Sequence, residues 1–140
     1  MTKTLEYSIY HFFEHILKLK ISQKSMIRGE LYGASIPLYF KDEEYSFYLF
    51  FQKQALNEIA QFLLHEELKE DGLADLVKEV ANQIIGYAKK LLNDTNGKDE
   101  YRLGVPEYLG RIDAFSKIKL KEKFTYEVKN ASFRIGYKKI

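Results

Sequence analysis

A carboxylate, an amide and a glycine recur at helical spacing in the middle of this chain. The stretch from Asp71 to Asn93, DGLADLVKEVANQIIGYAKKLLN, predicts one long helix. At about 100° per residue, one face carries four residues within roughly 60° of one another, Asp75, Glu79, Asn82 and Gly86. Asn and Gly are poor helix formers, together costing about 1–1.5 kcal/mol relative to Ala. The pattern therefore predicts a hydrogen-bonding surface on which another molecule docks, with an ordinary solvated face as the alternative.

The opposite arc of this predicted helix is apolar. It holds Leu73, Leu76, Val77, Val80, Ala81, Ile84, Ile85, Tyr87, Ala88, Leu91 and Leu92. We expect this arc to pack on the core, which turns the polar arc outward. Asp71 is expected to cap the helix, and Asp75 falls in its first turn, where a negative charge also complements the helix dipole.

Composition indicates one folded domain, residues 1–140. The chain has 140 residues, is 46% hydrophobic, and contains no cysteine, so disulfides, thiolate catalysis and cysteine-ligated metal sites are excluded. No apolar run approaches about 18 residues and no signal pattern is present, so we expect a cytoplasmic protein without membrane insertion. The net charge of +2 gives no reason to expect nucleic acid as a partner.

The segments before the long helix alternate between the apolar spacing of a helix and that of a strand. We expect a helix over 3–20 with Leu5, Ile9, Phe12, Phe13, Ile16 and Leu17 at helical spacing. Two strands, Ser25–Tyr32 and Ala34–Phe40, are expected to part near Gly33, with Pro37 at an edge or bulge, before a third strand at Tyr45–Phe51. A helix over about 53–68 should bury Leu56, Ile59, Ala60, Leu63 and Leu64.

The C-terminal part predicts a loop followed by a hairpin. Residues 93–104 are polar with two glycines and read as a mobile loop. Alternation then predicts that Ile118, Leu120, Phe124, Tyr126 and Val128 share one face, interrupted only by Glu122. After a turn at Lys129-Asn130, Phe133, Ile135 and Tyr137 alternate with polar residues. The expected fold class is α/β of the α+β type: a mostly antiparallel sheet with helices packed on one face.

Two other patterns invite sharper hypotheses, and we favour neither. His11, Glu14 and His15 spell H-x-x-E-H, a zinc-protease spacing, but the surrounding Phe and aliphatic residues favour a packing helix. Lysines at 117, 119, 121 and 123 form a basic stripe, which we interpret as a solvated sheet face rather than a nucleic-acid surface.

The pattern D-x3-E-x2-N-x3-G, followed by Val105-Pro106 and a closing hairpin, resembles the CheX/CheC chemotaxis phosphatase family. It is most similar to the CheX branch, because only one such helix is present. The upstream GASIPLYF and YLFFQKQALNEIA segments fit the three-strand-then-helix order of that family, and the likeness covers roughly residues 25–140.

The resemblance implies a CheC-like fold and dephosphorylation of the phospho-aspartate of a CheY-like response regulator. Asn82 would orient the attacking water, and Glu79 would pair with a lysine of the partner and fix the register of docking. Gly86 would let the backbone of the partner approach, and Asp75 would either contact the partner or stabilise the helix start. Pro106 would support the neighbouring loop. The Mg²⁺ would belong to the receiver, so no cofactor or metal is expected in this chain.

The resemblance also implies a homodimer built by sheet pairing, for which 45–51 and the C-terminal hairpin are expected to supply strand edges. Two alternatives to the phosphatase remain at this stage. One is a non-catalytic module of the same fold that binds a receiver domain, and the other is an unrelated structural or ligand-binding α/β domain.

Overall fold

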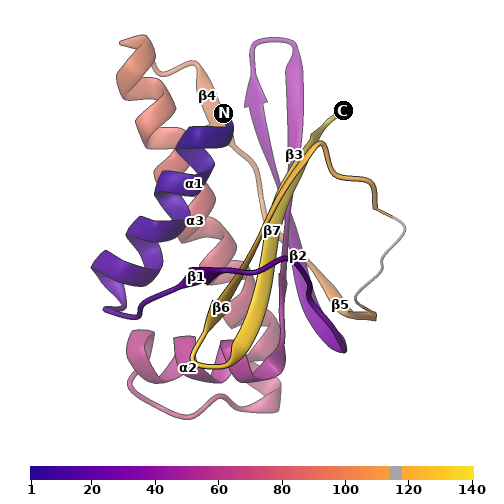
Figure 1. The fold of residues 1–140 in the computed structure, drawn as a ribbon. Coiled ribbons are helices and arrows are strands. Elements are labelled where there is room, and N and C mark those ends of the chain that lie inside the picture. The colour runs from indigo at the N-terminus through magenta and orange to yellow at the C-terminus, as the bar shows by residue number, and fades with distance from the viewer. Residues whose placement is uncertain (114–117) are drawn as a thin grey trace.

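The computed structural model describes residues 1–113 and 118–140, which form an antiparallel sheet with helices on one face (Figure 1). The strands are β1 (Ser22–Gln23), β2 (Glu30–Phe40), β3 (Glu43–Phe51), β4 (Tyr101–Leu103), β5 (Glu107–Asp113), β6 (Glu122–Val128) and β7 (Ala131–Lys139). Their order is β1-β6-β7-β3-β2-β4, and β5 also pairs with β2. The predicted fold class is confirmed.

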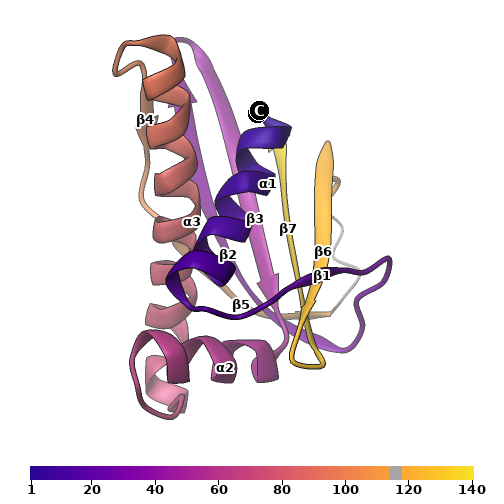
Figure 2. The same cartoon turned by 60° about the vertical axis from the view of Figure 1, so that its left-hand side comes forward.

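The helices cover the concave side of the sheet. They are α1 (Thr2–Tyr10), continued by a π-helical segment (His11–Ile16), then α2 (Lys53–Leu63), a 3-10 turn (Glu70–Gly72) and α3 (Leu73–Asn96). In Figure 2, α1 and α3 run side by side along the sheet and α2 crosses its lower end. The buried Ser8 hydroxyl donates to the Ile84 carbonyl, which fixes α1 against the middle of α3.

The main core lies between these helices and the sheet, and it is rich in aromatic rings. Phe13, Phe51 and Tyr126 each stack on Phe133, with ring centroids 4.4, 5.6 and 5.4 Å away. A second, smaller cluster of Ile27, Leu31 and Phe50 sits on the other face of the sheet. Strands β2 and β3 therefore carry packed apolar side chains on both faces of the sheet.

The break predicted at Gly33 is wrong, because β2 runs through it, although its pairing with β5 shifts register between Gly33 and Ala34. Phe50 of β3 lies across Gly33: a Cβ at this position would come within 2.8 Å of the Phe50 ring. The glycine makes room for an aromatic side chain on the second face rather than ending a strand. Pro37 lies within β2 at a gap on one side of the strand, because β5 pairs with β2 only as far as Ser35 and β4 pairs with it only from Leu38. A residue without an N–H fits such a local edge.

The hairpin of β6 and β7 is confirmed, with Lys129 and Asn130 at positive φ in the turn. The prediction that Ile118 and Leu120 share a face with Phe124 is wrong. Phe124 packs against the main core, whereas Ile118 and Leu120 pack against the second cluster. Gly136 in β7 makes this path possible: a Cβ there would collide with the Glu122 carbonyl oxygen and would meet Leu120 Cδ1 at 2.7 Å, so its absence leaves room for the chain to pass over the second face before β6 begins.

The two early helices end sooner than predicted. In the π-helical segment Leu17 N–H reaches back to the Phe12 carbonyl, and this wider turn buries the adjacent Phe12 and Phe13 but leaves Ile16 exposed. Helix α2 ends at Leu63, so Leu64 is exposed rather than buried, and His65 follows at positive φ.

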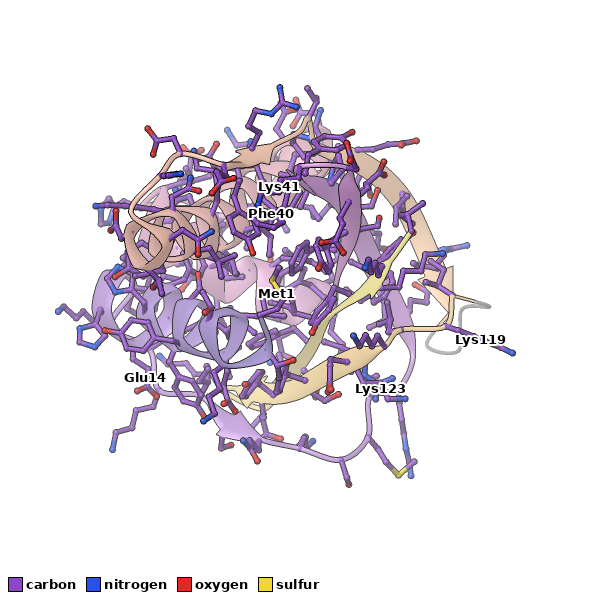
Figure 3. The ribbon with its side chains drawn as sticks, turned by 90° about the horizontal axis from the view of Figure 1, so that it is seen from above. Met1, Glu14, Phe40, Lys41, Lys119 and Lys123 are labelled. Carbon is purple, nitrogen blue, oxygen red and sulfur yellow. The ribbon has the colours of Figure 1, made fainter. Side chains whose placement is uncertain are left out.

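Lys119, Lys121 and Lys123 of the basic stripe are exposed, and Figure 3 shows Lys119 and Lys123 on the side of the molecule away from the helices. Lys117 lies outside the described residues. Within the part of the chain that the structure describes, no helix is both long enough and apolar enough to cross a membrane.

Candidate functional site

Helix α3 presents the predicted arcs, although it begins two residues later than predicted. Gly72 rather than Asp71 is the N-cap, because residues 70–72 form a 3-10 turn. The buried apolar residues are Leu73, Leu76, Val77, Val80, Ala81, Ile84, Ile85 and Ala88, as the periodicity predicted. Tyr87, Leu91 and Leu92, predicted to join them, are only half-buried. The opposite face is consequently turned away from the core.

The four residues singled out by the sequence lie along this outward face. Asp75 and Glu79 are exposed, and Asn82 and Gly86 are half-buried. Glu79 and Asn82 are three positions apart on one helix, a spacing that brings their Cβ atoms to about 5–6 Å. A carboxylate and an amide thus face solvent side by side, on a rigid element fixed from behind by the core.

Asp75 has a partner within its own helix. Its Oδ1 lies 3.7 Å from the Lys78 ammonium, and the side chain of Asp75 is 85% exposed. An exposed pair of this kind contributes about 0.2–0.5 kcal/mol to the helix. The pair and its place in the first turn both favour a role of Asp75 at the helix start, while its exposed carboxylate also remains open to another molecule.

Glu79 also has a partner, and the sequence did not single it out. Gln83 Nε2 donates to Glu79 Oε1 at 3.1 Å. The two residues are four apart, the spacing at which helix side chains meet, so the signal was present in the sequence. The contact holds one carboxylate oxygen of Glu79 and leaves Oε2 for another molecule.

Strand β4 borders the C-terminal half of the outward face, where the sequence predicted only a loop. The buried Asn93 of α3 bonds twice to the backbone of Tyr101: its Oδ1 accepts from the Tyr101 N–H at 2.8 Å, and its Nδ2 donates to the Tyr101 carbonyl at 3.1 Å. The strand then brings Leu103 beside Gly86, and Pro106 follows in the connection from β4 to β5.

Gly86 is not required by the packing of this chain. A Cβ built there would meet only Leu103 Cδ2, at an ordinary contact distance of 3.7 Å. Gly86 also lines an open hollow of about 320 Å³ with Lys89, Lys90, Asn93, Asp94 and Asp99. A glycine that costs about 1 kcal/mol in a helix interior therefore lies where the surface is open.

On the other side of α3, Tyr87 meets the imidazoles of the π-helical segment. The rings of His11 and Tyr87 stack at 4.0 Å, and those of His11 and His15 at 5.5 Å. Burial, and to a lesser extent the nearby His15, lower the pKa of His11. In residues 1–113 and 118–140, no three or more His, Cys, Asp or Glu side chains gather where they could hold a metal ion.

Comparison with protein families places this helix in a known context. The model of the family described as "Chemotaxis phosphatase CheX" matches residues 32–128, which include all of α3 and the β4–β5 connection. The chain belongs to the CheX family. A search of curated proteins finds no match.

Solved structures of CheX-like and CheC-like proteins share the fold. The CheX structure from Vibrio vulnificus has a TM-score of 0.74 at 18% identity, covering 96% of this chain and 97% of its own. A CheC-like protein from a Shewanella species has a TM-score of 0.69 at 20% identity, covering 98% and 96%. A CheX–CheY–BeF3–Mg²⁺ complex from Borrelia burgdorferi has a TM-score of 0.67 at 16% identity, covering 99% and 96%. At these identities the likeness concerns the fold.

Proposed function

We propose that this chain removes the phosphoryl group from the phospho-aspartate of a CheY-like receiver domain, with α3 as the docking and catalytic element. The observation that carries the proposal is the position of Glu79 and Asn82, one turn apart on the outward face of α3, in a member of the CheX family. The Borrelia complex supports it, since a protein of this fold binds CheY there. A cytoplasmic location belongs to the same proposal.

The reaction requires a water molecule held in line with the scissile bond. Water attacks phosphorus, the bond from phosphorus to the aspartyl oxygen breaks, and inorganic phosphate and a free carboxylate result. Asn82 is suited to hold that water, because its amide oxygen accepts a hydrogen bond and brings no negative charge near the phosphoryl group. The half-buried position of Asn82 restricts its side chain, which favours one orientation of the water.

The residues around Asn82 then take docking roles. Glu79 pairs with a lysine of the receiver and sets the register of α3 against it. Gly86 leaves room for the backbone of the receiver. The packing of this chain does not itself require a glycine there, because a Cβ would make only an ordinary contact of 3.7 Å with Leu103. Pro106 stiffens the connection beside α3. Asp75 contributes through the helix start, with its pair to Lys78.

The chain brings no cofactor to this reaction. The receiver supplies a Mg²⁺ ion and a lysine, which neutralise charge on the phosphoryl group. The part left to this chain is to position the water and to hold the two surfaces together.

A receiver-binding module without catalysis is the alternative, and phosphate release separates the two. The CheY-like receivers of the same organism are phosphorylated with acetyl phosphate, and phosphate release is followed with and without the chain. Acceleration that saturates with receiver concentration supports the phosphatase. Tight binding of a receiver without acceleration supports the binding module.

We also propose a homodimer built by sheet pairing. The strand 45–51, expected to supply an edge, does not: β3 lies between β2 and β7. The hairpin does, since β1 covers β6 only from Thr125 onward, and no described strand lies beyond Glu122–Phe124. Uncovered strand backbone of this kind pairs readily with a second copy. Light scattering at tens of micromolar should give the mass of a dimer, and a monomer mass would refute it.

A further inference from the structure

We propose that Gln83 is a positioning residue for Glu79 and so sets how tightly α3 captures the receiver. This inference rests on the proposed function and deepens it, because it names how the docking carboxylate is held before the partner arrives. The carrying observation is the hydrogen bond from Gln83 Nε2 to Glu79 Oε1, 3.1 Å long, on the outward face of α3.

The positions around the helix axis show from which side Gln83 contacts Glu79. At about 100° per residue, Glu79 falls between Asn82 and Gln83 around the helix axis. Gln83 therefore approaches Glu79 from the side away from Asn82. One carboxylate oxygen is occupied on that side, and Oε2 remains for a cation of the partner.

The charged residues near Glu79 do not contact its carboxylate, whereas Gln83 does. Lys78, next to Glu79, pairs with Asp75 on the opposite flank at 3.7 Å. No lysine or arginine of the described residues lies within ion-pair distance of Glu79, and the side chain that contacts its carboxylate is Gln83. A neutral donor holds the carboxylate without neutralising it, so its full charge stays available to the receiver.

Restraining a long side chain before binding reduces the entropy that is lost when the complex forms. Without Gln83, Glu79 samples several rotamers, and the receiver must select the productive one. The expected consequence is weaker capture with unchanged chemistry. In kinetic terms KM rises and kcat stays, since Asn82 and its water are untouched.

The test uses Gln83→Met, which keeps the length and the helix preference of glutamine and removes the donor. With a receiver phosphorylated by acetyl phosphate, KM should rise about 2- to 10-fold, which is the range for ordering one long side chain. The value of kcat should stay within about 2-fold of the wild type. Gln61→Met is the matched control and should change neither constant, because Gln61 is an exposed glutamine on α2 whose side chain makes no hydrogen bond to the described residues.

A double-mutant cycle separates positioning from direct contact. In a Glu79→Ala background, Gln83→Met should have no further effect, because the group it positions is gone. An additive loss would mean that Gln83 touches the receiver itself and would overturn the inference, as would an unchanged KM in the single variant. Absence of turnover by the wild type would instead overturn the proposed function, and this inference with it.

Discussion

Asn93 binds the backbone of Tyr101 as a neighbouring strand would, accepting from its N–H at 2.8 Å and donating to its carbonyl at 3.1 Å. The helix and β4 are thereby joined by one side chain of α3. This junction carries Leu103 and the β4–β5 connection to the border of the outward face. The shape of the candidate site thus depends on an amide about three turns beyond Asn82.

Replacing that amide should loosen β4 without disturbing the helix. Asn93→Ala leaves the N–H and carbonyl of Tyr101 without these partners, so we expect a loss of about 1–3 kcal/mol in the free energy of unfolding. Urea denaturation measures the loss, and hydrogen exchange at the Tyr101 amide should accelerate. Asn96→Ala, at the exposed end of the same helix, is the control. Unchanged stability and protection in Asn93→Ala would show that the junction holds β4 by other contacts.

Gly86 offers a substitution in which stability and activity should change in opposite directions. Gly86→Ala gains about 0.8–1 kcal/mol of helix stability, and its Cβ meets Leu103 at an ordinary 3.7 Å. If the receiver approaches this surface, the same change should raise KM, and Gly86→Leu should raise it further. Urea midpoints and steady-state kinetics give the two readouts. A stabilised Gly86→Leu variant with wild-type kinetics would remove Gly86 from the docking surface.

His11 should make the fold sensitive to mild acid. Burial against Tyr87, followed by the nearby His15, lowers the pKa of His11 in the folded chain. The unfolded chain therefore takes up the proton more readily, and the free energy of unfolding should fall as the pH drops below about 6.5. The decline levels off below the pKa of the folded state.

Urea denaturation from pH 7.5 down to 5 on the wild type and His11→Gln checks this dependence. The variant should lose part of the slope below about pH 6.5. His65→Asn is the control for replacing a histidine, because His65 is exposed and at positive φ, which Asn tolerates. Identical slopes in wild type and His11→Gln would contradict the assignment.

The sequence predicted those parts that depend on local periodicity. The buried arc of α3, the hairpin turn at Lys129-Asn130 and the outward face with Glu79 and Asn82 all follow from spacing along the chain. What it missed depends on contacts between distant residues. Leu120 crosses to the second face because Gly136, far along the chain, leaves room, and Tyr101 joins a strand because Asn93 holds it.

A glycine inside a strand predicts a break at Gly33, but it can equally mark a close approach by another side chain, as Phe50 makes here. The π-helical turn at Phe12 and Phe13 does not follow from a 3.6-residue period either, because its wider turn buries two adjacent rings on the same side of the helix. In both places tertiary packing decided the backbone.

The central claim is that Asn82 acts on the attacking water and Glu79 acts on docking. Neither side chain belongs to the buried arc, so Ala at either position should fold, and Asn82→Ala gains some helix preference. Glu79→Ala should weaken binding of the beryllofluoride-loaded receiver as well as turnover, through the loss of a charge-assisted contact. Val80→Asp, on the buried arc, should unfold the domain.

The most direct measurement is phosphate release from the phosphorylated receiver by wild type and Asn82→Ala, side by side with their affinities for the beryllofluoride-loaded receiver. We predict that Asn82→Ala lowers kcat by about 10²-fold or more, the range for losing one preorganised hydrogen-bonding group, while its affinity stays within a few-fold of the wild type. A folded Asn82→Ala variant with full turnover would contradict the account.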